Sequence, residues 1–302
     1  MRRIILAVLM VLILPIVSCA AGVYRPEKYG DEILQALIND KAPKFRVETF
    51  SDDVTGLAVE YSVYLPEGYS PGKKYPAVFF IADASAAGKG PAFSLTQGYG
   101  ALVWTEYDCI VIVPSYPELI LDDHSGFVLT RYVDLTGRFV EWAVENYSVD
   151  PSRVYATGQS MGCMTFLVLA AENPEMFTAC LFVSGQWDIR QLEGLKAQKF
   201  IYIASAGDDK ASAGQKEVID LFRRSGVPFV WHQDIDARNQ DYSLPRDMTA
   251  CFFMTFKAGT TLPEDLEAGQ YSEHMTSFDY AYRMRAVREW LLSQRKETNR
   301  HE

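Results

Sequence analysis

The order of hydrophobic and polar residues predicts two kinds of strand. Residues 44–50 and 57–65 alternate between apolar and polar positions, so that one face of each strand is apolar. We expect these two segments to form an antiparallel hairpin at the edge of a sheet. From residue 77 on, the strands are continuously apolar, as in strands that are buried on both faces of a parallel sheet. These later strands are predicted at 77–81, 109–113, 154–156, 179–183, 200–204, 227–232 and 252–256.

Helical patterns separate most of the later strands. Residues 130–147, for example, carry apolar side chains at helical spacing through Val133, Phe139, Val140 and Val144. Strands that alternate with helices predict an α/β fold, in which a mostly parallel central sheet has helices on both faces. The predicted helices are 31–38, 130–147, 164–171, 215–224 and 276–294.

Length and charge narrow the class of protein. The chain has 302 residues, and no linker divides its later part, so we expect residues 41–302 to form one domain. Its formal net charge is −10, and the sequence contains no basic cluster. These two features argue against nucleic acid or an anionic membrane surface as a partner.

The first residues have the pattern of an export signal. Two arginines after Met1 are followed by an apolar run over 4–14 and by small residues at 18–21. The run is too short to span a bilayer. Residues 1–18 therefore read as a signal peptide, and the sequence before Cys19 favours the type in which that cysteine is lipidated; ordinary cleavage after Ala20 is the alternative. Residues 19–40 would then be a tether followed by a short helix.

The other four cysteines do not have the spacing of zinc ligands. They lie inside apolar segments rather than in loops, which is typical of buried thiols. A disulfide between two of them cannot be deduced from the sequence. They are Cys109, Cys163, Cys180 and Cys251.

The strand at 154–156 runs directly into the sequence Gly-Gln-Ser-Met-Gly at 158–162, which an apolar helix follows. A serine at the tip of a sharp strand-to-helix turn leaves its neighbours no room for side chains, hence glycine two residues before it and two after. Ser160 would then lie at a helix N-terminus, where backbone N–H groups and the helix dipole favour a negative oxygen. We therefore take Ser160 as the candidate nucleophile.

A serine hydroxyl needs an adjacent base, most often a histidine that a carboxylate orients. The chain has four histidines. Three of them are excluded. His124 precedes Ser160, whereas the base follows the serine in this type of fold. His301 is in the polar terminal tail, and His232 is inside a strand pattern. His274 remains as the candidate base, in a polar loop between the last predicted strand and the last helix.

The acid should follow a strand that comes after Ser160 in the chain. Asp208 and Asp209 come directly after the strand at 200–204, and we choose Asp208 because it follows Gly207. Asp209 stays open as the alternative. Asp188 is a weaker candidate, since it has the pattern of a helix N-cap.

Together, these motifs make the region after the signal peptide similar to a known superfamily. It resembles the α/β-hydrolase superfamily, and within it the secreted serine esterases and predicted peptidases that are similar to feruloyl esterases and polyhydroxybutyrate depolymerases. The resemblance implies that Ser160, Asp208 and His274 act as nucleophile, acid and base. Many relatives carry His-Gly after the first buried strand, whereas this chain has Ala82-Asp83-Ala84 there. The matching segments are 158–163, 184–188, 206–211 and 272–274.

The altered segment changes the expected oxyanion hole. Backbone donors need no particular side chain, so the N–H of Met161 and that of Asp83 or Ala84 can serve. Asp83 would then have to direct its carboxylate away from the developing negative charge.

The pocket walls should come from loops at the carboxyl ends of the strands, at 88–99, 116–124 and 186–187. Gln159 and Trp187 are the candidate substrate-binding residues, although Trp187 could equally be part of the core. Residues 122–124 offer two aspartates and a histidine, but no further ligand is clustered with them in the sequence. We therefore predict neither a metal nor a cofactor.

The sequence thus predicts an exported serine hydrolase that acts on a small-molecule or polysaccharide-linked carboxylic ester. A serine peptidase would use the same groups, because the choice between ester and amide depends on pocket shape and leaving-group geometry. A lipid-anchored binding protein without catalytic activity, on the same scaffold, is the alternative from another class.

Overall fold

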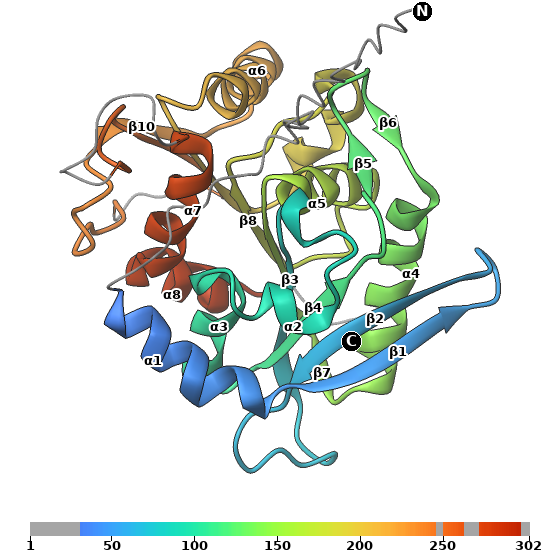
Figure 1. Ribbon diagram of the computed structural model, residues 1–302. Coiled ribbons are helices and arrows are strands. Elements are labelled where there is room, and N and C mark those ends of the chain that lie inside the picture. Colours follow the sequence, from blue (N-terminus) through green and yellow to red (C-terminus); the bar gives the residue numbers. More distant parts are fainter. Residues whose placement is uncertain (1–30, 246–249, 263–271, 297–302) are drawn as a thin grey trace, which may run out of the picture.

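The computed structural model describes residues 31–245, 250–262 and 272–296. The predicted signal peptide at 1–18, Cys19 and His301 lie outside this part. Nine of its strands form one sheet in the order β1-β2-β4-β3-β7-β8-β9-β11-β10 (Figure 1). Their bounds are β1 Arg46–Asp52, β2 Leu57–Tyr64, β3 Tyr75–Ile81, β4 Ile110–Ser115, β7 Val149–Gln159, β8 Ala179–Val183, β9 Phe200–Ser205, β10 Val230–Ile235 and β11 Cys251–Phe256.

The pairing of the strands follows their hydrophobic patterns. β1 and β2 pair antiparallel at one edge, and β2 pairs antiparallel with β4. The pairs from β4 across to β10 are parallel. Most strands predicted as continuously apolar, such as β4, are buried along their whole length, whereas β1 is mostly exposed. The strand predicted at 227–232 is the exception, because β10 lies at the other edge of the sheet, begins at Val230 and is only partly buried. The predicted edge hairpin is therefore confirmed.

Helices cover both faces of this sheet (Figure 1). On one face, apolar side chains of α4 Arg131–Asn146, α5 Met161–Glu172 and α6 Asp209–Ser225 pack on alternate strand residues such as Phe79. On the other face, α1 Glu32–Lys41, α3 Tyr99–Leu102, α7 Glu273–Arg283 and α8 Arg285–Ser293 form a second core around residues such as Phe80. The predicted α/β-hydrolase arrangement, a mostly parallel sheet between two helical layers, is confirmed.

The remaining elements are short. They are the helical turns η1 Ala42–Lys44, η2 Ala84–Ala86, α2 Pro91–Ser94, η3 Val103–Glu106, η4 Ile189–Gln191 and η5 Glu193–Ala197, and a hairpin of β5 Leu121–Asp122 with β6 Val128–Leu129.

The prediction of one helix over 276–294 was wrong, because the structure has two helices, which begin at Glu273 and meet at Met284. Met284 has an extended backbone, with φ −64° and ψ 102°. The break is stabilised by the buried Arg288, which donates to the carbonyls of Tyr282 and Arg283 at 2.5 and 2.9 Å. A side chain thus replaces the helical hydrogen bonds that are lost there.

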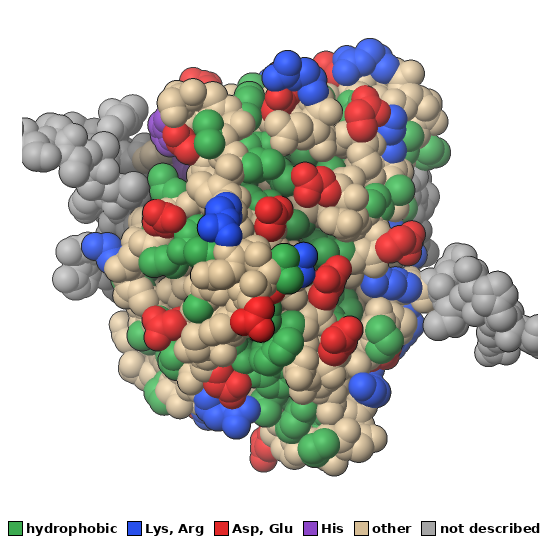
Figure 2. All heavy atoms as spheres, turned by 90° about the vertical axis from the view of Figure 1, so that its right-hand side faces the viewer, with side chains coloured by type: hydrophobic (Ala, Val, Ile, Leu, Met, Phe, Trp, Pro, Cys, Tyr) green, Lys and Arg blue, Asp and Glu red, His purple; other side chains and the backbone are tan. Residues whose placement is uncertain are grey.

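No helix in the described part of the chain is long and apolar enough to cross a membrane. Figure 2 shows the side of the molecule that lies to the right in Figure 1, where acidic, basic and hydrophobic side chains are interspersed. The described residues form no continuous basic patch on this side, which agrees with the negative net charge.

Candidate active site

Ser160 lies at the turn between β7 and α5, in a backbone conformation that is rare for a side chain other than glycine. Its φ is 51° and its ψ is −115°. Its backbone N–H donates to the carbonyl of Val183 on β8 at 3.0 Å, which holds the turn against the sheet. A non-glycine residue with positive φ is a strained position that the surrounding structure must fix, and such positions cluster at functional sites.

The two glycines of the motif are required by space. A Cβ on Gly158 would lie 2.4 Å from the carbonyl carbon of Gly162, and a Cβ on Gly162 would lie 2.0 Å from the carbonyl oxygen of Ile81 on β3. Both contacts are with backbone atoms, which cannot move without shifting a strand or a helix. The turn is therefore tight because α5 starts in direct contact with β3.

Replacing Gly162 with alanine is expected to destabilise the fold by about 3 kcal/mol, because the new methyl group overlaps with backbone. The midpoint of thermal unfolding should fall by roughly 5–10 °C. The matched control is Gly72→Ala, since a Cβ at Gly72 meets only the hydroxyl of Ser70 at 3.9 Å. Equal midpoints for Gly162→Ala and the wild type would contradict this account of the turn.

The structure brings Ser160, His274 and Asp208 into one hydrogen-bonded chain. His274 Nε2 lies 2.8 Å from Ser160 Oγ, and its Nδ1 lies 2.6 Å from Asp208 Oδ2. The Asp208 side chain is 6% exposed and that of His274 is 25% exposed. A buried acid thus faces a histidine that is open to solvent on the side of the serine.

The helices explain how the acid and the histidine are held. Asp208 is the N-cap of α6, and its Oδ1 accepts from the N–H of Ala211 at 3.2 Å, so its two oxygens have separate partners. α6 therefore begins at Asp209, six residues before the predicted start. His274 is not in a loop, as predicted, but in the first turn of α7.

The other candidate acids do not contact His274. Asp209 is exposed in the first turn of α6. Asp188 caps η4, as its pattern indicated, and Arg190 beside it lowers the pKa of its carboxyl group.

The segment expected to supply the second oxyanion donor is tied to the serine motif. The Asp83 carboxylate is buried and accepts from the backbone N–H and the hydroxyl of Ser85 at 3.0 and 2.5 Å. It also accepts from Gln159 Nε2 at 2.7 Å. Gln159, predicted to bind substrate, is thus 5% exposed and engaged with Asp83 instead.

A pocket of about 410 Å³ opens at Ser160 and His274. Ala84, Met161 and Met164 line it on the serine side. The segment 119–124 lines it as well, in agreement with one predicted wall. No described residue from 88–99 belongs to its lining, so that predicted wall was wrong.

Of the predicted pair at 186–187, Gln186 lines the pocket and Trp187 does not. Trp187 is 1% exposed, its indole N–H donates to Gln191 at 3.2 Å, and its ring packs 5.1 Å from that of Phe127. Trp187 is therefore part of the hydrophobic core, which is one of the two possibilities that the sequence left open.

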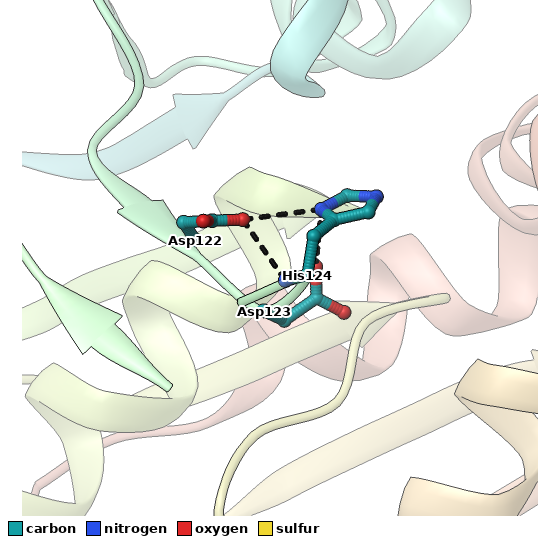
Figure 3. A group of neighbouring side chains, drawn as sticks. All are labelled: Asp122, Asp123 and His124. Atoms are coloured by element: carbon teal, nitrogen blue, oxygen red, sulfur yellow. Dashed lines mark hydrogen bonds and ion pairs between the residues drawn. The ribbon is translucent and has the colours of Figure 1, made fainter. Parts of the chain in front are cut away.

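A polar cluster of Asp122, Asp123 and His124 forms part of the pocket wall (Figure 3). One ligand-type atom from each lies within 4.8 Å of the others, so these residues could bind a cation. His124 Nδ1 lies 3.1 and 3.2 Å from oxygens of Asp122 and Asp123, and Lys210 Nζ lies 3.0 Å from Asp123. The backbone N–H of His124 and the Ser125 hydroxyl lower the pKa of Asp122 to about 2. Because the protein itself compensates these carboxylates, we keep the prediction that no metal is needed.

A doubly wound sheet with a serine at the turn after β7, and with an acid and a histidine after later strands, defines an α/β-hydrolase fold. The comparisons agree, since the family model described as "Putative esterase" matches residues 54–247. The chain therefore belongs to this esterase family.

Curated relatives match part of the chain. Acetylxylan esterase A from Aspergillus ficuum is 30% identical over 146 residues, which are 46% of this chain and 46% of that protein. Acetylxylan esterase A from Talaromyces purpureogenus is 27% identical over 146 residues, which are 46% of this chain and 36% of that protein. The chain thus spans less than half the length of these relatives.

Solved structures match most of the chain at low identity. A thermostable esterase has a TM-score of 0.68 at 20% identity and covers 84% of this chain and 64% of its own. An S-formylglutathione hydrolase from Staphylococcus aureus has a TM-score of 0.54 at 13% identity, over 82% of this chain and 98% of its own. At sequence identities this low, the similarity shows a shared fold and nothing more.

Proposed function

We propose that the protein is a serine hydrolase that cleaves carboxylic esters through an acyl-enzyme on Ser160. The observation that carries the proposal is the hydrogen-bonded chain from Ser160 through His274 to Asp208 at the mouth of a pocket. Membership of the esterase family supports the choice of ester as the bond that is cleaved.

The proposed mechanism assigns one role to each group. His274 Nε2, at 2.8 Å, takes the proton as Ser160 Oγ attacks the ester carbonyl. Asp208, at 2.6 Å from Nδ1, keeps the imidazole in the tautomer whose Nε2 can accept that proton, and stabilises the imidazolium. His274 returns the proton to the leaving alcohol, and water then hydrolyses the acyl-enzyme by the reverse sequence.

The oxyanion is assigned to the backbone N–H groups of Met161 and Ala84. Both residues line the pocket beside Ser160. In the described part of the chain, no backbone hydrogen bond uses either N–H as a donor, which leaves both for a ligand oxygen. Met161 is the first residue of α5, so the dipole of that helix adds to the stabilisation.

In this proposal Gln159 sets the position of Ala84 by holding Asp83. Gln159→Ala is expected to lower kcat about tenfold, with little change in KM, because an oxyanion donor that moves away acts mainly on the transition state. Asp83→Asn should have a smaller effect, since asparagine can still bond to Ser85 and to a rotated Gln159 amide. Steady-state kinetics on a nitrophenyl ester measures both, and a Gln159→Ala enzyme with unchanged kcat would contradict this role.

The substrate class and location are also proposed. Relatives named acetylxylan esterase suggest an ester linked to a polysaccharide. The N-terminal sequence suggests export across the bacterial inner membrane, with a lipid anchor on Cys19 or, failing that, secretion. We propose no cofactor, and a membrane contact only through this anchor.

The test is turnover together with covalent labelling. Acetyl, butyryl, octanoyl and hydroxycinnamoyl nitrophenyl esters should be hydrolysed, and a fluorophosphonate should label Ser160 at one site per chain. Saturation without turnover would indicate the binding protein considered above, and cleavage of peptide amides in preference to esters would indicate a peptidase. Either result would refute the esterase proposal.

A further inference from the structure

Glu273 stands directly before His274, at the first position of α7, and its carboxylate binds two other segments. Oε2 accepts from the hydroxyl of Ser205 at 2.6 Å and from that of Thr261 at 3.1 Å. Oε1 accepts from the backbone N–H of Gly259 at 2.8 Å. Ser205 is the last residue of β9, and the other two lie after β11. One side chain therefore ties the start of α7 to the carboxyl ends of two neighbouring strands.

The same carboxylate fills the space over the loop that carries the proposed acid. A Cβ on Gly207 would lie 1.9 Å from Glu273 Oε1. Gly207 does not have a φ in the left-handed range, so its backbone could adopt the conformation of alanine, and the three atoms nearest to the added Cβ all belong to this carboxylate. Since Asp208 follows Gly207, Glu273 packs against the segment that positions the acid while it adjoins the histidine in the chain.

The first turn of α7 is also held from another side. Ser277 Oγ donates to the carbonyl of His274 at 2.9 Å and lies 2.7 Å from Ser184 Oγ, at the end of β8. The backbone of His274 is thus fixed between three strand ends. The contacts of Glu273 reach both β9 and the loop at Gly207. They therefore determine how far the first turn of α7 lies from Asp208.

We propose that Glu273 is a positioning residue for the proposed reaction, one that fixes the distance between His274 and Asp208. This inference rests on the function proposed above. A displacement of about 1 Å in a catalytic array lowers the rate by as much as 100-fold, so a side chain that sets this distance acts mainly on kcat. An acidic residue that merely favours the helix dipole would affect stability and leave kcat unchanged.

Glutamine separates the contacts from the charge. Its oxygen can accept from Gly259, and its amide NH₂ can donate to the hydroxyl oxygens of Ser205 and Thr261. Glu273→Gln should therefore keep kcat within about threefold, whereas Glu273→Ala should lower kcat about 30-fold with KM within about twofold. Glu289→Gln is the matched control, because Glu289 is exposed on α8 and pairs only with Arg285, at 2.6 Å, among the described residues.

Gly207→Ala tests the same contact from the other side. It should lower kcat in the wild type by an amount similar to Glu273→Ala, and it should have little further effect in the Glu273→Ala background, because the clash is then removed. Gly207→Ala also decides the question if Glu273→Ala fails to fold, since Gly207→Ala leaves the carboxylate of Glu273 in place.

The experiment is steady-state kinetics on nitrophenyl acetate for these variants, with Ser160→Ala as the inactive reference. An inactive wild type, or an active Ser160→Ala enzyme, would refute the proposed function itself. If the wild type is active, Ser160→Ala is not, and Glu273→Ala and Gly207→Ala keep wild-type kcat, the positioning role alone is refuted. Additive losses in the Gly207→Ala, Glu273→Ala double variant would refute it as well.

Discussion

Replacing Ser160 with alanine is expected to lower kcat on an activated ester by about 10⁵- to 10⁶-fold. The change removes only Oγ, the atom that lies 2.8 Å from His274 Nε2, and leaves the pocket and the oxyanion donors in place. KM should therefore stay within about threefold, and the residual rate should reflect binding and the oxyanion hole alone. Steady-state kinetics and fluorophosphonate labelling provide the measurement.

The matched control is Ser62→Ala, since Ser62 is fully buried on β2 and its hydroxyl has no hydrogen-bond partner among the described residues. It should retain wild-type kcat and labelling. Full activity of Ser160→Ala, or labelling at another residue, would contradict the proposal that an acyl-enzyme forms on this serine.

The second large effect is expected for Asp208→Asn, with a loss of about 10⁴-fold in kcat. The asparagine can keep Oδ1 on the N–H of Ala211 and so preserve the N-cap of α6. Its NH₂ would then face His274 Nδ1 and favour the tautomer whose Nε2 carries a proton, which cannot accept one from Ser160.

Asp209→Asn separates the two acids that the sequence left open. Asp209 is exposed at the start of α6, so its loss should change kcat by less than about fivefold. The thermal midpoints of both variants should stay near that of the wild type, because the helix cap is retained. A larger loss for Asp209→Asn than for Asp208→Asn would reverse the assignment of the acid.

The sequence predicted the fold well because parallel strands buried on both faces have an unambiguous pattern. Apolar runs such as 109–113 can only lie between two helical layers, and the edge hairpin was recognisable from its alternation. The order of serine, acid and histidine then restricted the candidates, because the carboxyl ends of parallel strands meet at one edge of the sheet. Position in the chain thus predicted proximity for Ser160, Asp208 and His274.

The sequence could not predict which side chains face the pocket. Trp187 follows a strand end, as a pocket residue would, yet it turns into the core below Phe127. Gln159 and Asp83 are 76 positions apart, and nothing local indicates that they bond to each other.

The predicted helix boundaries were wrong for a related reason. The start of α6 depends on the cap at Asp208, and the break at Met284 depends on a buried arginine that lies four residues later. Both are interactions of single side chains, and neither changes the hydrophobic pattern.

The four cysteines of the described part, Cys109, Cys163, Cys180 and Cys251, are all buried. Burial raises the pKa of each thiol, that of Cys251 to about 12, so these thiols stay protonated and unreactive in the folded state. The same thiols become reactive only when the helical layers separate from the sheet, which makes them vulnerable to oxidation or mispairing in a chain that is still unfolded.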